Sequence, residues 1–347
     1  MISGIYYTSY EQDMALRKTP AQRIRLAILI LLLLSFPFFA SRYYLTLANQ
    51  IGIAVIGAIG LNILVGYTGQ ISLGQGAFMA VGAYTAGILT AHYGVPWWAS
   101  IPVAALFTAL VGTFFGLPSL RLKGLYLAIA TLAAQVIILW IVTHWKAVTG
   151  GVEALVVPTP KLFGVKMNTD FNFYWVIWGT AVLITIMTVN LFRTHYGRAF
   201  VAIRDQDIAA SVMGIDLFRY KLLAFAISSF VVGLAGALLA HYRTIVNWER
   251  FTMDVSVTYL AMIIIGGLGS VTGSYLGAAF MTLLPALITN LGRAMKASFP
   301  AIEGLIPFIQ LAIFGLVIII FLIFESEGLN KIWKDIKDYF RLWPFSY

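Results

Sequence analysis

The chain has 347 residues, of which 60% are hydrophobic and only 11% are charged. A soluble globular domain averages roughly 25% charged residues, so the composition excludes that class and indicates a polytopic membrane protein. The net charge of +9 does not predict nucleic-acid binding, because the basic residues are spread over short loops and form no single patch. The chain has no Cys, which excludes disulfides and thiolate metal sites.

A helix needs about 20 apolar residues to cross a hydrocarbon core of ~30 Å. The hydropathy pattern predicts ten such segments, none of which contains an Asp, Glu, Lys or Arg. The eighth and ninth are short for a full crossing. The first resembles a signal peptide, but it lacks a convincing cleavage site and further segments follow at once. The predicted segments are 26–40, 44–65, 71–91, 97–118, 124–143, 173–192, 222–240, 257–268, 274–290 and 304–324.

The distribution of basic residues predicts an orientation. With the N-terminus inside, the inner loops and tails hold 15 of the 23 Lys and Arg residues and the outer loops hold 8. The positive-inside rule therefore predicts that both termini and the loop 193–221 lie in the cytoplasm. The segment 145–171 then lies outside, where it is either a lid or docking surface for an external partner or a passive connector. The tail 328–347 has apolar residues at helical spacing with Lys between them, which predicts an amphipathic helix at the membrane surface.

The polar loop 193–221 carries five Lys or Arg residues and three Asp between two apolar segments. Its core, 204–214, is predicted to form a short helix with a small apolar face that fits a groove on a partner. Two acidic residues stand near the start, where the helix dipole favours negative charge, and a glycine can end the helix. The apolar positions are Ile208, Val212 and Ile215, the acidic ones are Asp205 and Asp207, and the glycine is Gly214.

Two segments rich in Gly, Ser, Thr and Gln, 66–79 and 266–281, interrupt the apolar pattern. Irregular backbone at membrane depth is tolerated only where it is buried in protein or lines a cavity, and transporters use broken helices to bind substrate. Lining of a substrate path and close helix packing are both open for the stretches 66–76 and 266–273. For the pairs Gly112/Gly116 and Gly273/Gly277, packing is favoured. The candidate path residues are Gly66, Thr68, Gln70, Ser72, Gln75, Gly266, Gly269 and Ser270.

The chain lacks two features with which a transporter drives its own cycle. No ionisable residue falls inside the predicted segments, whereas an ion-coupled carrier usually keeps one there. The P-loop pattern GxxxxGK[ST] is also absent. Uphill transport would therefore draw its energy from another polypeptide in the cytoplasm, and 193–221 is the natural contact. The alternative from another class is a stand-alone channel or secondary carrier, which needs no partner for flux.

Several stretches resemble a known family. Ala209-Ala210-x-x-x-Gly214 resembles the coupling motif of ABC importer permeases, with Asp207 one place earlier than the usual Glu. Longer stretches resemble the LivM-type permease subunits of branched-chain amino acid ABC transporters, and the resemblance runs from about residue 44 to the end of the chain. These stretches are 60–89, 122–133, 197–238, 259–285 and 341–347.

The resemblance implies an all-α importer permease bundle of about ten transmembrane segments, forming a single domain over 1–347 in the bacterial cytoplasmic (inner) membrane. It implies a second, LivH-type permease, two cytoplasmic ATPase subunits that bind ATP and Mg²⁺, and an extracytoplasmic binding protein for leucine, isoleucine or valine. No cofactor and no enzymatic site are expected in this chain. The implied ATPase-coupling residues are Arg204, Asp205, Asp207, Ala209, Ala210 and Gly214.

The chain departs from the family's usual residues at Gln75, at Val152 after Thr149-Gly150-Gly151, and at Thr258. These positions lie near the predicted path or the external face. They leave a second class of solute open, namely urea or short-chain amides, whose permeases belong to the same broader family.

Overall fold

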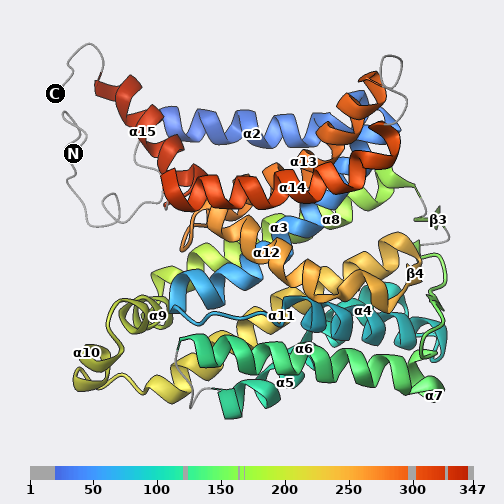
Figure 1. The fold of residues 1–347 in the computed structure, drawn as a ribbon, viewed down its shortest axis with the longest axis horizontal. Helices are drawn as coiled ribbons and strands as arrows, with labels where there is room; N and C mark the ends of the chain where they lie inside the picture. The colour runs from blue at the N-terminus through green and yellow to red at the C-terminus, as the bar shows by residue number, and fades with distance from the viewer. Residues whose placement is uncertain are drawn as a thin grey trace. The chain divides into compact units, whose positions relative to one another are not determined.

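The computed structural model describes residues 20–119, 124–162, 165–167, 169–295, 302–324 and 327–342. The described residues are mostly helical (Figure 1), so the predicted all-α class is confirmed. Ten helices match the ten predicted segments in chain order. They are α2 (Pro20–Phe39), α3 (Arg42–Thr68), α4 (Gln75–Ala91), α5 (Trp97–Ser119), α6 (Leu125–His144), α8 (Asp170–Arg193), α11 (Leu217–Arg243), α12 (Met253–Gly266), α13 (Val271–Met295) and α14 (Ile302–Phe324).

Among the described residues, seven of these helices are long and apolar enough to cross a membrane: α3, α5, α6, α8, α11, α13 and α14. Helix α4 has 17 residues and α12 has 14, so both are short for a crossing. The apolar part of α2 is Ala27–Phe39. The chain is therefore an all-α multi-pass membrane protein, and the figure of about ten crossings stays a prediction.

The chain divides into two compact units, 1–46 and 47–347. The first contains α2, with Pro37 inside the helix, and the start of α3. The second contains the rest of α3 and the other described elements. Its shorter elements are α7 (Lys146–Thr149), β1 (Leu155–Val156), β2 (Lys161–Leu162), β3 (Val165–Lys166), α9 (His195–Asp205), α10 (Asp207–Val212), β4 (Ile245–Val246), the 3₁₀ helix η1 (Trp248–Phe251) and α15 (Leu329–Leu342).

Helices α3 and α11 form the centre of the second unit. In the most apolar window of α3, 83% of the residues are buried, whereas none is in that of α14, which contacts the core only through partly buried side chains. Small residues let the neighbouring helices approach closely. A Cβ on Gly233 of α11 would touch Thr108 of α5, and one on Gly236 would touch the backbone of Met79 in α4. The core is thus stabilised by close packing of helix backbones at glycine as well as by contacts between apolar side chains.

The two GxxxG pairs serve helix packing, as predicted. Gly112 and Gly116 of α5 face Ser229 and Phe225 of α11, so each glycine leaves room for a side chain of the central helix. Gly273 and Gly277 of α13 face the backbone of α12. Because an added Cβ would collide with main-chain atoms there, α12 and α13 can pack this closely only through glycine.

Both Gly-rich segments break the helical pattern. Helix α3 ends at Thr68 and α4 begins at Gln75, with non-helical backbone between them. Helix α12 ends at Gly266, and α13 begins at Val271 after a turn in which Gly267 has φ +117° and Gly269 has φ +70°. Only glycine adopts such values without strain. The stretch 257–290 is therefore two helices. The predicted orientation requires this, because a single helix through 257–290 would place the basic C-terminal tail outside.

The loops of the second unit gather at two opposite ends (Figure 1). At one end β1 pairs antiparallel with β4, with Leu155 opposite Val246, and the indole Nε1 of Trp97 donates to the carbonyl of Lys161 at 3.0 Å. At the other end lie α9 and α10. These two groups of loops are the same as the inner and outer loops that the count of basic residues distinguishes. The assignment of the α9–α10 end to the cytoplasm rests on that count.

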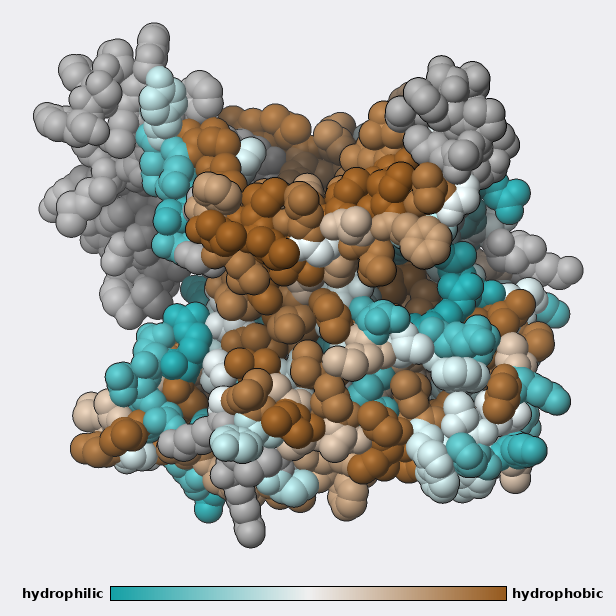
Figure 2. All heavy atoms as spheres, in the orientation of Figure 1, coloured by the Kyte–Doolittle hydropathy of each residue, from teal (hydrophilic) through white to brown (hydrophobic). Residues whose placement is uncertain are grey.

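The surface is consistent with a position in a bilayer. On the face of the second unit drawn in Figure 2, hydrophobic residues occupy the middle and hydrophilic residues lie toward both ends. A soluble protein rarely exposes apolar patches of such extent, whereas lipid tails favour them.

Candidate functional site

The loop 193–221 is folded into two helices. The predicted short helix is present as α10 and ends before Gly214, but it begins at Asp207, so the expected start at Arg204 is wrong. Helix α9 ends at Asp205, Gln206 is extended with φ −157° and ψ 99°, and α10 begins at Asp207. The reason lies in the apolar faces. Helix α9 buries Phe200 and Ile203 in the bundle, while most apolar side chains of α10 point away from it. The chain must turn between the two helices to allow both arrangements.

Helix α10 presents apolar side chains to its surroundings. Ile208 is 68% exposed, Val212 81% and Met213 82%, whereas Ala210 is only 4% exposed and packs on the bundle. Gly214 follows with φ +84°, the left-handed conformation that commonly ends a helix. Asp207 lies in the first turn and Ala209 is exposed. Exposed apolar residues rimmed by polar ones mark protein contacts, so α10 has the character of a docking element.

Arg204 belongs to the last turn of α9. Its Nη1 donates to the carbonyl oxygen of Gly66 at 3.0 Å. Its Nε and Nη2 each lie 3.0 Å from Oδ1 of Asp205. This two-pronged contact fixes the guanidinium plane, and the side chain is 38% exposed. Arg204 and Asp205 are therefore placed to join the loop to the end of α3, and neither lies on α10.

Beside Arg204 the two Gly-rich segments touch each other. A Cβ on Gly66 would collide with Oδ1 of Asn62 and with the amide nitrogen of Gly269, and one on Gly269 would lie 2.7 Å from Nη1 of Arg204. The amide of Gly269 donates to Oδ1 of Asn62 at 2.9 Å. Nδ2 of Asn62 donates to the carbonyl of Ser270 and to Oγ of Ser274. The side chain of Asn62 thereby holds the α12–α13 turn against α3.

The remaining candidates in the second segment serve this turn. Gly266 faces the backbone of Gly273. The hydroxyl of Ser270 accepts from the amide of Gly273 at 3.1 Å and is hydrogen-bonded to Thr272 Oγ1 at 2.8 Å, which supplies a partner at the start of α13.

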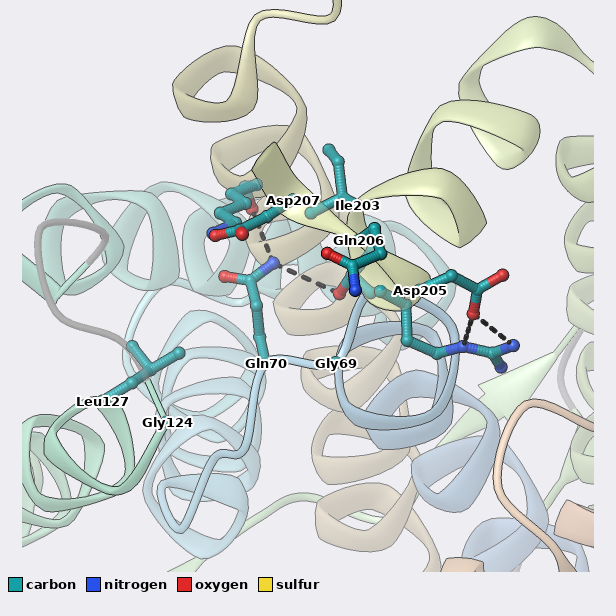
Figure 3. A pocket seen from close by; sticks show the side chains of 11 residues that line it. Gly69, Gln70, Gly124, Leu127, Ile203, Asp205, Gln206 and Asp207 are labelled. Atoms are coloured by element: carbon teal, nitrogen blue, oxygen red, sulfur yellow. Dashed lines mark hydrogen bonds and ion pairs between the residues drawn. The ribbon is translucent and has the colours of Figure 1, made fainter. Parts of the chain in front are cut away.

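A cavity of about 250 Å³ lies between the loop and the end of α3 (Figure 3). Gln70 is buried in its wall, and its Nε2 donates to Thr68 Oγ1 at 3.2 Å and to the carbonyl of Lys221 at 3.3 Å. Nζ of Lys221 lies 3.9 Å from Asp207 Oδ2. Among the described atoms, Oε1 of Gln70 has no hydrogen-bond partner. Thr68 and Gln70 thus lie at the end of the bundle that carries α9 and α10, and they face the α9–α10 junction.

Gln75 lies deeper in the bundle. Its Nε2 donates to the carbonyl of Gly57 at 3.0 Å, and residue 57 precedes residue 66 by about 13 Å along α3, at 1.5 Å per residue. Ser72, on the non-helical stretch that leads there, accepts from the amide of Gly74 at 3.3 Å. The broken segment therefore runs from the α9–α10 end toward the middle of the bundle, where α4 begins.

The first amides of α4 would lack partners without side chains from other helices. The amide of Gly76 donates to Ser256 Oγ at 2.8 Å, and that of Ala77 to Gln135 Oε1 at 2.6 Å. Gln135 also donates to the carbonyl of Phe251 at 2.7 Å and accepts from Ser256. We call Gln75, Gln135 and Ser256 the polar centre. It joins α4, α6 and α12, and its side chains are almost fully buried.

Sequence reasoning missed Asn62, Gln135 and Ser256. These side chains are neutral, and all three lie outside the two Gly-rich segments that contain the neutral candidates. The available signal was an isolated Asn or Gln in an apolar segment, since a buried amide must find hydrogen-bond partners.

The chain resembles named permeases. Residues 43–322 match the family described as branched-chain amino acid transport system / permease component. The chain is 33% identical over 305 residues to the high-affinity branched-chain amino acid transport system permease protein LivM of Escherichia coli (strain K12), covering 81% of this chain and 70% of the relative.

More distant relatives show the breadth of the family. The chain is 28% identical to the probable branched-chain amino acid transport permease protein LivH of Methanocaldococcus jannaschii, over 68% of this chain and 76% of the relative. It is 25% identical to the autoinducer 2 import system permease protein LsrC of Escherichia coli O157:H7, over 78% and 80%. No solved structure matches the chain. The match over 43–322 and the 33% identity show that this chain belongs to the permease family of branched-chain amino acid transport systems, as a LivM-type member.

Proposed function

We propose that this chain imports branched-chain amino acids as the LivM-type permease subunit of an ATP-driven transporter. Membership of the family makes it a permease subunit of an ABC importer. The relative with 33% identity is named for high-affinity branched-chain amino acid transport, which supports leucine, isoleucine and valine as solutes. The observation that carries the coupling role is α10, whose Ala209-Ala210-x-x-x-Gly214 pattern lies on a protruding helix with exposed apolar residues.

The proposed assembly contains a second, LivH-type permease, two cytoplasmic ATPase subunits that bind ATP and Mg²⁺, and an extracytoplasmic binding protein. The similarity to a LivH relative supports a homologous partner. The excess of basic residues in the loops at the α9–α10 end supports an inner-membrane orientation with both termini in the cytoplasm.

In the proposed mechanism, closure of the ATPase dimer displaces α10 and, through the turn at Gln206, the end of α9. Arg204 transmits this displacement to Gly66, and the contact of Gly66 with Gly269 passes it to the α12–α13 turn. The segments 66–76 and 266–273 are therefore proposed to rearrange together and to line the path. The buried hydrogen bonds of the polar centre lie where α4 begins. We propose that the path is closed at this depth of the bundle.

Two exposed residues on one side of α10 test the docking. We expect Ile208→Asp/Val212→Asp to prevent retention of the ATPase subunits during purification, because two carboxylates would have to be buried in an apolar contact. The second permease should still co-purify, which shows that the variant chain is inserted and folded.

The matched control is Val152→Asp, which adds a carboxylate at a residue that is 64% exposed at the other end of the bundle. It should retain the ATPase subunits. Normal retention by the α10 double variant would sink the assignment of α10 as the docking helix.

The solute is tested on the binding protein, which does most of the selecting in such importers. Calorimetry of the cognate binding protein against leucine, valine, alanine and urea should show tight binding of leucine and valine only. Binding of urea in preference to leucine would move the proposal to the urea and amide class.

A further inference from the structure

Helix α15 has two unlike flanks beside an apolar face. Ile332, Trp333, Ile336 and Tyr339 recur at helical spacing and are all partly or largely exposed. Lys334 and Lys337 stand three residues apart on the flank next to Trp333, while Asp335 and Asp338 share another flank. A helix with an apolar stripe, an aromatic residue and a basic flank is suited to the boundary between lipid headgroups and acyl chains.

The position of α15 fits such a boundary. In Figure 1 α15 runs crosswise to α14 and lies at the end of the second unit that carries α9 and α10. The spans define the membrane normal, so a helix across them at one end lies along the membrane surface. The apolar stripe of α15 then contacts the bilayer itself. The exposed lysines favour anionic headgroups, because each Lys near an anionic surface adds roughly 1 kcal/mol to the binding free energy.

The first turn of α15 is attached to the turn between α12 and α13. Asn330 is buried and its Oδ1 accepts from Thr272 Oγ1. A Cβ on Gly328 would lie 2.6 Å from the amide nitrogen of Gly267, and one on Gly267 would lie 3.1 Å from Cβ of Asn330. The turn at 267–270 is thus held on one side by α15, and on the other by Asn62 and by the Gly66–Gly269 contact beside Arg204.

We propose that α15 binds the anionic lipid surface and, through Asn330 and Gly328, holds the α12–α13 turn in the position that Arg204 needs for coupling. The importer would then hydrolyse ATP faster in response to the binding protein when α15 lies on anionic lipid. The lipid contact stands on the geometry of α15 alone, whereas its effect on coupling rests on the proposed function.

The lipid contact is tested first, without any transport assay. Because the chain has no Cys, Ile336→Cys gives it a single thiol for an environment-sensitive fluorophore. The complete importer is placed in vesicles of phosphatidylcholine alone or with phosphatidylglycerol, and quenching by lipid-attached nitroxides reports contact with the bilayer. We expect stronger quenching in the anionic vesicles, and weaker quenching at high salt, because salt screens the attraction.

Charge variants identify the flank responsible. Lys334→Gln/Lys337→Gln should weaken the lipid contact roughly fivefold for each lysine, whereas Lys334→Arg/Lys337→Arg should preserve it and Asp335→Asn/Asp338→Asn should strengthen it. Equal quenching in both vesicle types, unchanged by the Gln variants, would overturn the lipid assignment.

The effect on coupling is tested with Asn330→Leu, which removes the bond to Thr272 and leaves the lipid-facing stripe intact. For the unaltered chain we expect ATP hydrolysis stimulated by the binding protein to be at least twofold faster in anionic vesicles. In Asn330→Leu the quenching should persist while this lipid dependence disappears. Retention of the lipid dependence in Asn330→Leu would overturn the link through the turn. An importer that shows no stimulated hydrolysis in either vesicle would contradict the proposed function and leave the quenching result standing.

Discussion

Arg204 connects the loop 193–221 to the end of α3. Its guanidinium donates to the carbonyl of Gly66, next to the site where Gly66 and Gly269 exclude any side chain. Asp205 orients the guanidinium from the neighbouring position. One cation therefore connects the α9–α10 loop to both broken segments, which are separated by about 200 residues in the sequence.

We expect Arg204→Ala to lower ATP hydrolysis stimulated by the binding protein at least tenfold. Loss of a hydrogen bond from a charged donor costs about 1.5–3 kcal/mol, and a factor of ten corresponds to about 1.4 kcal/mol. Arg219→Ala is the matched control. Arg219 is 84% exposed and pairs with Asp216 at the surface, where ion pairs contribute ~0–1 kcal/mol, so the rate should stay within twofold. Similar losses in the two variants would remove any special role for Arg204.

At the scale of single residues, the sequence identifies candidate functional residues more easily than it predicts their contacts. The coupling motif selected Arg204, and the glycine pattern selected Gly66 and Gly269, yet no pattern shows that these three meet. Such contacts depend on the packing of distant helices. The neutral amides of Asn62 and Gln135 are nearly invisible to a hydropathy scan, although they make the most hydrogen bonds at the two junctions described above.

The start of α4 depends on side chains from other helices. This helix begins in the interior of the bundle, so its first amides need partners that water cannot supply. Gln135 from α6 provides one of these partners and also binds the carbonyl of Phe251. The start of α4 is thus fixed by side chains from α6 and α12 rather than by a cap within its own segment.

We expect Gln135→Leu to lower the free energy of unfolding by about 2–4 kcal/mol, because it leaves the amide of Ala77 and the carbonyl of Phe251 without partners in the interior. The control is Gln310→Leu. Gln310 donates to the carbonyl of Pro285, which also accepts from Thr289, so its loss leaves no unpaired group there and should cost about 1 kcal/mol or less. Thermal unfolding of the purified complex measures both, and equal shifts would refute the claim for Gln135.

The element pattern was largely predictable, since each of the ten apolar segments forms a helix and both Gly-rich segments end one. The amphipathic tail also forms the predicted helix over 329–342, and 343–347 lies outside the described residues. Two features were not predictable. The break at Gln206 follows from tertiary packing of α9, and the two-residue strands β1 and β4 are too short to leave a periodic signal.

For the molecule as a whole, the loops of the second unit fall into two groups at opposite ends. The charge count from the sequence separates the same groups. This agreement supports the predicted orientation, in which α10 faces the cytoplasm and the β1–β4 end faces outward.

Single cysteines test that orientation in cells. Because the chain has no Cys, Val152→Cys and Ser211→Cys each introduce its only thiol, at exposed positions at the two ends. A membrane-impermeant maleimide should label Val152→Cys in intact spheroplasts and Ser211→Cys only after permeabilisation. Labelling of Ser211→Cys in intact spheroplasts would invert the topology and place α10 away from any cytoplasmic ATPase.

The most direct test of the central claim is solute uptake into proteoliposomes. This chain is reconstituted alone, or with its second permease, the ATPase subunits and the binding protein, and radiolabelled leucine is followed with and without ATP. We predict accumulation above equilibrium only in the complete assembly with ATP, and no leucine flux through this chain alone. Flux through the isolated chain, or ATP-independent uptake by the assembly, would contradict the account and favour a channel or secondary carrier.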